Sequence, residues 1–303
     1  MRRIKIILPA TITDLGPALG GIGLAVGLYT TIEISERSDD NLHVETEGED
    51  AGRYSVGLRH PVVLGLMRVF QLLEKTVLGL NVRIENQIPH SAGLGVEAIY
   101  MVAGIVGANN LLGTPFNRSQ ILELCAQETS RPNQATAAIL GGLTVAVLDN
   151  DTLIYRSLPV ETFQLVIVAP DLDEYAEALR DAVPERVLLR DAAANLARVP
   201  LLLDALRSGD MYLLDQVADD RLYAPHIREH LPGFHEAVAA ARRAGAKSLL
   251  LARGGILIAF AEHDHRQIAQ AMQAALQNAG STVHYWVLPI DRQGIVISVA
   301  QTG

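Results

Sequence analysis

A loop with two glycines, set between an alternating apolar segment and a run of small residues, is the part of the sequence best suited to chemistry. It runs from Ile88 to Ala98 and reads IPHSAGLGVEA, with Gly93 and Gly95 near its centre. Glycine lets a backbone turn sharply and approach a ligand closely. A helix that begins directly after such a loop points unpaired N–H groups at one spot, which suits a phosphate group. Two interpretations stay open at this point: a phosphate-binding loop, or an ordinary turn between a strand and a helix.

Other catalytic patterns are absent from the sequence. It contains no G-x-x-x-x-G-K-[ST] loop, no Rossmann G-x-G-x-x-G after a strand and no serine-nucleophile elbow. His90, His226 and His230 lack the spacing of a zinc site, so we expect them at the surface or in loops. The single cysteine, Cys125, lies in an apolar helical pattern and is expected to be buried.

The elements expected to position the loop are a strand over residues 80–86, where polar and apolar side chains alternate, and a helix over residues 96–112. A strand over residues 2–8 is expected to lead into a turn-rich stretch over residues 9–23. Elsewhere in the first half we expect strands at 24–35, 42–47, 143–149 and 152–158, and helices at 60–78, 119–129 and 133–140.

Residues 159–162 form the expected boundary between two domains, because a new strand pattern begins directly after them. The order of elements beyond it is typical of a split βαβ sandwich with extra helices. The expected strands are 163–170, 248–252, 255–260, 283–288 and 295–300, and the expected helices are 174–181, 188–208, 232–244 and 266–279.

The composition narrows the class of function. The chain has 303 residues, of which 49% are hydrophobic, and this is enough for a sizeable core. The net charge of −9 is spread along the chain without Lys/Arg clusters, which argues against a nucleic-acid partner. No run of about 18 uncharged apolar residues occurs, so no membrane span is expected. The N-terminal MRRIKIILPATIT is interpreted as a strand and not as a signal peptide, and the protein is expected to be cytoplasmic.

The loop resembles the phosphate loop of the GHMP small-molecule kinases, usually written P-x-x-x-G-L-G-S-S-A-A. Pro89, Gly93, Leu94, Gly95 and Ala98 match it in register. Four further segments resemble motifs of the homoserine kinase branch in the same order and spacing. They are LPATITDLGPALGGIGLAVGLY (8–29), RPNQATAAILGGL (131–143), DDRLYAPHIREHLPGF (219–234) and AGAKSLLLARGGILIAF (244–260).

The resemblance implies an α+β fold of two domains. Residues 1–159 would form an N-terminal βαβ-type domain with a left-handed crossover, and residues 160–303 a C-terminal ferredoxin-like split βαβ domain. It implies transfer of the γ-phosphate of ATP to the hydroxyl of homoserine or a related small alcohol, as in threonine biosynthesis, with ATP and Mg²⁺ as cofactors. A small-molecule substrate is therefore the expected partner, and a homodimer is an expectation from the family.

The resemblance also implies the site residues. Glu128 fits an acidic position that helps to hold magnesium, and Glu97 is a second candidate metal ligand. Arg180 is a candidate for catalysis and, with Arg228, for binding a substrate carboxylate, which suits the bidentate guanidinium. Asp14 and Gln134 are further substrate-binding candidates. ATP would be held by the nine loop residues Pro89, His90, Ser91, Ala92, Gly93, Leu94, Gly95, Val96 and Glu97.

Several positions depart from the family pattern. Val96 and Glu97 replace the two loop serines; valine offers no oxygen to a metal, whereas glutamate is an oxygen ligand that magnesium accepts. In the opening motif the family has Asn where this chain has Asp14, and Asp where it has Gly20. The last glycine turn loses its hydroxyls and carries Arg253, which either faces an anion or caps the strand end. Three interpretations therefore stay open: a homoserine kinase-like enzyme, a kinase for a different small alcohol, or a catalytically inactive relative that binds a ligand or regulates a partner.

Overall fold

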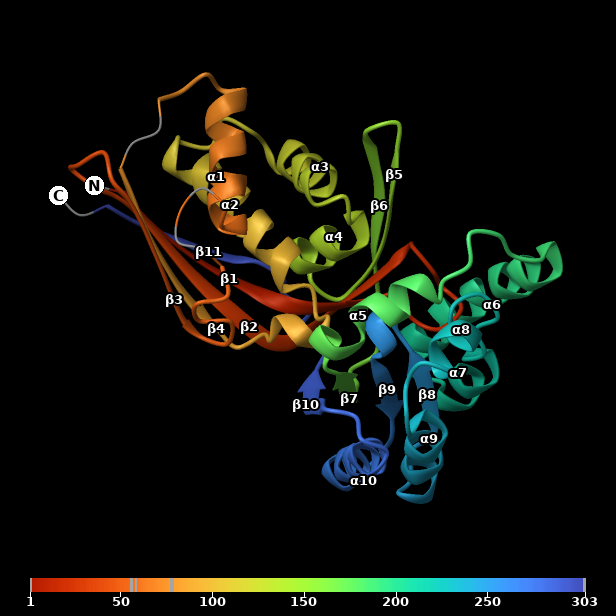
Figure 1. Cartoon of the computed structure of the whole chain (residues 1–303). Helices are drawn as coiled ribbons and strands as arrows, with labels where there is room; N and C mark the ends of the chain where they lie inside the picture. The colour runs from red at the N-terminus through yellow and green to blue at the C-terminus, as the bar shows by residue number, and fades with distance from the viewer. Residues whose placement is uncertain (1, 55–56, 58, 77–78, 302–303) are drawn as a thin grey trace.

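The computed structural model describes residues 2–54, 57, 59–76 and 79–301 and contains two β-sheets with helices packed against them (Figure 1). The larger sheet has seven strands, in the order β11-β1-β2-β4-β3, with β5 paired to β2 and β6 paired to β5. Its strands are β1 (Arg2–Thr13), β2 (Ile22–Glu36), β3 (Leu42–Gly48), β4 (Leu80–Asn86), β5 (Leu143–Asp149), β6 (Thr152–Leu158) and β11 (Val296–Gln301).

Four helices cover one face of the larger sheet (Figure 1). They are α1 (Pro61–Leu72), α2 (Val96–Leu111), α3 (Arg118–Thr129) and α4 (Pro132–Leu140). The predicted βαβ unit is confirmed, because β3 and β4 pair in parallel and α1 lies between them in the chain. Helix α2 is buried along most of its length, which explains why its sequence is apolar on every side.

Strand β1 is longer than predicted. It continues through Pro9, where the pairing with β2 shifts register, and ends at Thr13. The turn-rich stretch, which was expected to begin at residue 9, therefore begins five residues later, after Thr13. A proline donates no backbone hydrogen bond, so an irregularity in the ladder is a place where a strand tolerates it. The extension carries Thr11 to the glycine loop, where its N–H donates to the Leu94 carbonyl.

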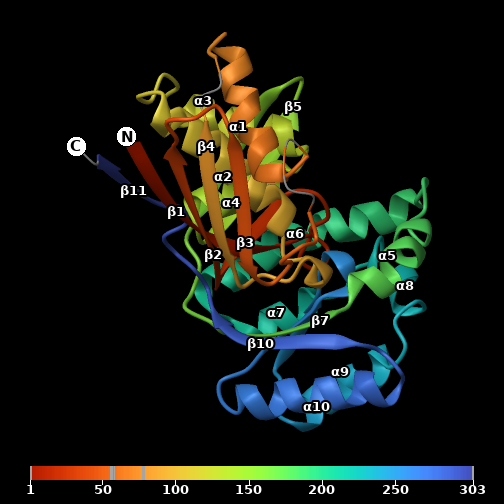
Figure 2. The same cartoon turned by 60° about the vertical axis from the view of Figure 1, so that its left-hand side comes forward.

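The second sheet has the strand order expected of a split βαβ domain. It comprises β7 (Gln164–Pro170), β8 (Ser248–Leu251), β9 (Leu257–Phe260) and β10 (Val283–Pro289) in the antiparallel order β10-β7-β9-β8. Figure 2 shows α9 (Phe234–Arg243) and α10 (His265–Asn278) on one side of it. The remaining helices are α5 (Leu172–Asp181), α6 (Leu189–Ser208), α7 (Met211–Val217) and α8 (Ala224–Arg228).

The last strand does not join the second sheet. β11 pairs with β1, so the chain returns to the first sheet after β10. The division into residues 1–159 and 160–303 did not anticipate this return, because alternating apolar residues fit the edge of either sheet. Asp291 fixes the return: its carboxylate accepts hydrogen bonds from the Tyr29 hydroxyl at 2.8 Å and from the Gly294 N–H at 2.7 Å.

One cluster of buried side chains extends from the first sheet into the second. It includes Ile4, Ile12 and Ile34 of the first sheet together with Leu165 and Phe260 of the second. A smaller cluster lies between the second sheet and its outer helices. Within the described residues, no helix has both the length and the apolar composition needed to cross a membrane.

Candidate functional site

The glycine loop is held in a single conformation by its neighbours. Asn86, at the end of β4, pairs with both backbone groups of Ile88, accepting from its N–H at 3.0 Å and donating to its carbonyl at 2.8 Å. A short 3₁₀ turn, η1 (His90–Ala92), follows. Further along, the Thr11 N–H donates to the Leu94 carbonyl at 3.0 Å and so ties the loop to β1.

Gly93 and Gly95 occupy conformations that other residues rarely adopt. Their φ angles are 69° and 84°. A Cβ atom on Gly95 would lie 2.4 Å from Thr11 Oγ1, and one on Gly93 would lie 2.8 Å from a methyl carbon of Leu172. Only glycine fits both positions. Helix α2 starts at Val96 without a side-chain cap, so its first N–H groups are open toward the space beside the loop.

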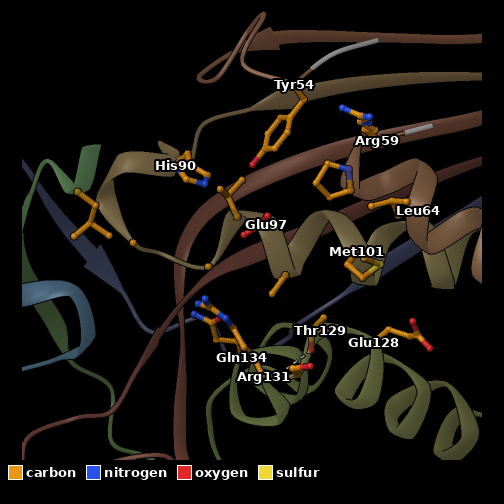
Figure 3. A pocket seen from close by; sticks show the side chains of 17 residues that line it. Tyr54, Arg59, Leu64, His90, Glu97, Met101, Glu128, Thr129, Arg131 and Gln134 are labelled. Atoms are coloured by element: carbon orange, nitrogen blue, oxygen red, sulfur yellow. Dashed lines mark hydrogen bonds between the residues drawn. The ribbon is translucent and has the colours of Figure 1, made fainter. Parts of the chain in front are cut away.

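A cavity of about 600 Å³ lies beside this loop. Figure 3 shows Tyr54 and Arg59 along one wall, Glu97 from the first turn of α2, and Arg131 and Gln134 on the opposite side. Arg131 and Gln134 come from the start of α4, and their side chains point toward the loop. The cavity thus places a glycine loop, an uncapped helix start and two arginines around one space, which suits a polyphosphate.

A second cavity, of about 230 Å³, adjoins the first. Ser130, Arg131 and Gln134 line both of them. The other walls of the smaller cavity are polar and come from the opening segment, from α4 and from the turn after β8. They are formed by Thr13, Asp14, Gly20, Pro132, Asn133 and Arg253. Two adjoining cavities of unequal size suit a large donor and a small acceptor that react at the shared boundary.

Five of the nine predicted loop residues line the larger cavity: His90, Gly93, Gly95, Val96 and Glu97. The other four, Pro89, Ser91, Ala92 and Leu94, are buried beneath the loop and support it. Val96 is 3% exposed and belongs to the buried apolar cluster, so its side chain serves packing.

The two candidate metal ligands lie in the same cavity but in different settings. Glu97 is exposed in the first turn of α2. Glu128, in the last turn of α3, accepts a hydrogen bond from Arg68 Nε at 2.6 Å and lies toward the far end of the cavity from His90 (Figure 3). No group of three or more His, Cys, Asp or Glu side chains suited to a metal is found among the described residues. Magnesium that is held mainly by phosphate oxygens needs only one or two carboxylates from the protein, so either Glu97 or Glu128 alone would be enough for such an ion.

Three of the four predicted substrate-binding residues line cavities, but not all the same one. Asp14 lines the smaller cavity, and Gln134 lines both. Arg228, in α8, lies with its guanidinium 5.5 Å from the centre of the Phe234 ring and lines a third cavity. Arg228 is not among the residues that line the two cavities beside the glycine loop. Arg180 lies in α5, but its side chain is outside the described part of the structure.

Arg59 and Arg131 are the charged residues of the larger cavity that sequence reasoning missed. Arg131 opens one of the motif segments, a signal that could have singled it out. Arg59 stands next to α1 in a stretch with no recognisable pattern. Tyr54 was missed as well; burial and, to a lesser extent, the charge of Glu97 raise the pKa of its hydroxyl well above the usual value. Cys125 is buried as predicted, and that burial raises the pKa of its thiol.

Comparison with known proteins gives one family and one fold. Residues 63–142 match the model of the GHMP kinases N terminal domain. The chain is 32% identical to the homoserine kinase of Moorella thermoacetica over 274 residues, which cover 90% of this chain and 92% of that protein. It is 31% identical to the homoserine kinase of a Synechococcus species over 299 residues, covering 97% and 98%.

Solved structures agree with this result at the level of the fold. The homoserine kinase of Cytophaga hutchinsonii superimposes with a TM-score of 0.84 at 22% identity and covers 98% of this chain and 97% of its own. A mevalonate kinase of L. major in complex with R-mevalonate superimposes with a TM-score of 0.69 at 19% identity, covering 95% and 96%. The predicted α+β architecture of the GHMP kinases is confirmed.

Proposed function

We propose that this chain, which belongs to the homoserine kinase family of the GHMP kinases, transfers the γ-phosphate of ATP to the hydroxyl group of homoserine or a closely related small alcohol. The observation that carries the proposal is the pair of adjoining cavities. The larger contains the glycine loop, and the smaller is polar and of a size for a small acceptor. ATP would occupy the larger cavity and the acceptor the smaller.

The loop would bind the phosphates of ATP through its backbone. The uncapped first turn of α2 offers N–H donors, and the Arg131 guanidinium adds positive charge at the boundary with the acceptor cavity. Glu97 and Glu128 are the side chains that would hold Mg²⁺, and Arg68 would keep the Glu128 carboxylate oriented. When bound, magnesium supplies charge neutralisation for the phosphate oxygens.

Positioning would account for most of the catalysis. Asp14 is the one carboxylate of the acceptor cavity among the described residues, and it is paired with Arg253, so it is poorly suited to accept the acceptor's hydroxyl proton. Phosphoryl transfer depends mainly on alignment and charge stabilisation, and a strong base is not required. The residues around the boundary, above all Arg131 and Gln134, would align the acceptor hydroxyl with the transferred group.

A coupled assay of ADP release tests the function. With ATP, Mg²⁺ and homoserine, we expect ADP formation well above a blank without homoserine. The Gly95→Ala substitution would place a Cβ against Thr11, and it should lower kcat/KM for ATP by roughly 10²-fold or more. Gly113→Ala is a matched control: its φ is 83°, it follows the other end of α2, and the nearest atom to its Cβ is 3.6 Å away.

ADP release equal to the blank with homoserine and with related small alcohols would overturn the proposal. Equal losses in Gly95→Ala and Gly113→Ala would show that backbone strain, and not the loop, accounts for the effect.

A further inference from the structure

The acidic group of the smaller cavity is already engaged by the protein. Asp14 is 2% exposed. Its Oδ2 accepts a hydrogen bond from Arg253 Nε, and its Oδ1 accepts from the Gly20 N–H at 2.7 Å and, more weakly, from Asn133 Nδ2 at 3.4 Å. A carboxylate has about four acceptor sites, and three are used here. Asp14 therefore has little capacity left to hold a cationic group of a ligand.

Both partners of this ion pair are on anchored segments. The Gly16 N–H donates to the Leu251 carbonyl at 2.9 Å, which ties the segment after Asp14 to β8. On the other side, the Gly254 N–H donates to the hydroxyl of the buried Tyr223 at 3.0 Å and fixes the turn that carries Arg253. The pair is thus part of the folded wall of the cavity and is not a contact between two mobile surface chains.

Positive charge remains in the cavity after this pairing. Among the described residues, its ionisable side chains are Asp14, Arg131 and Arg253, so the charges that line it sum to +1. The Arg253 side chain is 56% exposed although its Nε is bonded to Asp14, which leaves part of the guanidinium open to the cavity. Gly20 contributes no side chain, a Cβ there would meet no atom within 4 Å, and no second acid lines the cavity within the described part of the chain.

We propose that the acceptor cavity selects its substrate through a carboxylate and does not recognise an ammonium group, with Arg253 as the specificity-determining residue. This inference rests on the proposed function and narrows the substrate class to short hydroxy acids. Guanidinium groups bind carboxylates with two hydrogen bonds and fixed geometry. An ammonium group in the same cavity would face two arginines and an acid that is already satisfied.

Three acceptors that differ by one group test the inference. Homoserine carries both a carboxylate and an ammonium; 4-hydroxybutanoate lacks the ammonium; 2-aminobutane-1,4-diol lacks the carboxylate. Their binding to the full chain with Mg²⁺ and a non-hydrolysable ATP analogue is measured by calorimetry. We expect loss of the ammonium to change Kd by less than about threefold, and loss of the carboxylate to raise it by about 30-fold or more.

The opposite ranking of the two analogues, or binding of none of the three, would overturn the inference. This readout needs no turnover. Tight binding of the carboxylate-bearing acceptors without ADP release would overturn the proposed function alone, whereas ADP release with strong preference for homoserine over 4-hydroxybutanoate would overturn the inference alone.

Variants of Arg253 test its role directly. Arg253→Ser releases Asp14, so the affinity for homoserine relative to 4-hydroxybutanoate should rise by about tenfold. Adding Asp14→Asn to that variant should remove the gain. If Arg253→Ser fails to fold, Arg253→Gln takes its place. Glutamine keeps a hydrogen-bond donor but carries no charge, so the same ratio of affinities should rise. Arg207→Ser, on the exposed face of α6, is the matched control and should leave the ratio unchanged. An unchanged ratio in both Arg253 variants would contradict the assignment.

Discussion

Glu97 places a negative charge in the larger cavity, close to where the phosphate groups of ATP would lie. It stands in the first turn of α2, directly after the glycine loop, and its side chain is exposed. An acid in the first turn also stabilises a helix through its dipole, by about 0.3–1 kcal/mol. Without a cation between them, the negative charge of Glu97 would repel the phosphate groups of ATP. With magnesium between carboxylate and phosphate, the same charge becomes favourable.

Replacing Glu97 by Gln separates these two roles. If Glu97 helps to hold magnesium, Glu97→Gln should raise the Kd of ATP about tenfold when Mg²⁺ is present. When EDTA removes the metal, the same substitution should leave the Kd of ATP unchanged or make it smaller. Titration calorimetry under both conditions measures the ratio. Glu236→Gln is the control, because Glu236 is likewise an acid in the first turn of a helix, α9, but does not line the cavity. Tighter binding of Mg²⁺-ATP to Glu97→Gln would refute the metal role.

Among the elements, α1 begins with a buried histidine. His60 caps the helix by accepting from the Val62 N–H at 3.3 Å, and its ring packs against Tyr54 and Tyr100 with centroid distances of 5.1 and 5.5 Å. Burial lowers the pKa of His60 from 6.5 to about 4. The folded protein therefore keeps this imidazole neutral at a pH where the unfolded chain would protonate it.

This pKa shift predicts a loss of stability in mild acid. Between pH 6.5 and pH 4 the unfolded state binds more protons at this site than the folded state, so the free energy of unfolding falls as the pH is lowered. From pH 7 to pH 5 the loss is about 2 kcal/mol. His60→Asn keeps a capping side chain and should remove most of this loss. His263→Asn, at an exposed position, should not. Urea unfolding at pH 7 and at pH 5 measures the difference. Equal pH dependence in both variants would contradict the prediction.

The entry to α8 depends on one buried carboxylate. Asp220, 2% exposed, accepts from Asn195 Nδ2 at 2.7 Å and from three backbone N–H groups, those of Leu222 at 2.8 Å, Tyr223 at 3.1 Å and Ala224 at 2.6 Å. Asn195 in turn donates to the Pro17 carbonyl at 3.2 Å. Asp220 thereby links α6 and α8 to the segment that follows Asp14.

Removing this carboxylate should be far more costly than removing an exposed cap. Asp220→Ala leaves several buried donors without partners, and we expect it to lower the free energy of unfolding by about 3 kcal/mol or more. Asp210→Ala removes the exposed cap of α7, which accepts from the Leu213 N–H, and should cost about 1 kcal/mol. Urea unfolding of both variants gives the comparison. Similar losses would mean that the Asp220 network contributes little.

Local patterns predicted the elements well where one signal dominated. The strand over 80–86 has the predicted bounds. The cap of α3, in which Asn117 pairs with Gln120 in a capping box, is formed by residues three positions apart. Asn150 and Asp151 form the hairpin turn with φ angles of 45° and 66°. These features depend on residues a few positions apart, so the sequence displays them directly.

Features made by distant residues could not be predicted. Asp14 and Arg253 are separated by 239 positions in the chain. In the sequence they are two separate departures from the family pattern, and only the folded chain shows that the two side chains pair with each other. Similarly, nothing in the alternation of residues 296–301 says which sheet they join. The glycine loop was predicted because its spacing is local, whereas Arg59 reaches the same cavity without any local pattern.

In the whole molecule, the two sheets share one buried core, and the last strand of the chain returns from the second sheet to the first. β11 completes the first sheet after the second has been built, and Phe163 packs edge-on against Phe260 with ring centres 5.2 Å apart within the shared cluster. Residues 160–303 therefore supply part of the structure of residues 1–159. The acceptor cavity depends on the same arrangement, since Asp14 comes from the first half of the chain and Arg253 from the second.

Division of the chain at the predicted boundary should abolish folding of the first half. Residues 1–159 expressed alone lose β11 and the second-sheet side chains of the shared core, so we expect circular dichroism without a cooperative thermal transition. Co-expression with residues 160–303 should restore a folded complex. The intact chain should unfold in a single transition when the two sheets are followed by separate probes. A stable, cooperatively folded fragment of residues 1–159 would contradict this view.

In the proposed reaction, the two cavities hold ATP and a small hydroxy acid, and a phosphate group passes between them. ³¹P NMR of the purified chain with ATP, Mg²⁺ and homoserine tests it most directly, because one spectrum follows donor and product together. We expect a new phosphomonoester resonance that grows in equal amount with ADP and is absent without the acceptor. ADP accompanied only by inorganic phosphate, or no change in ATP, would contradict it.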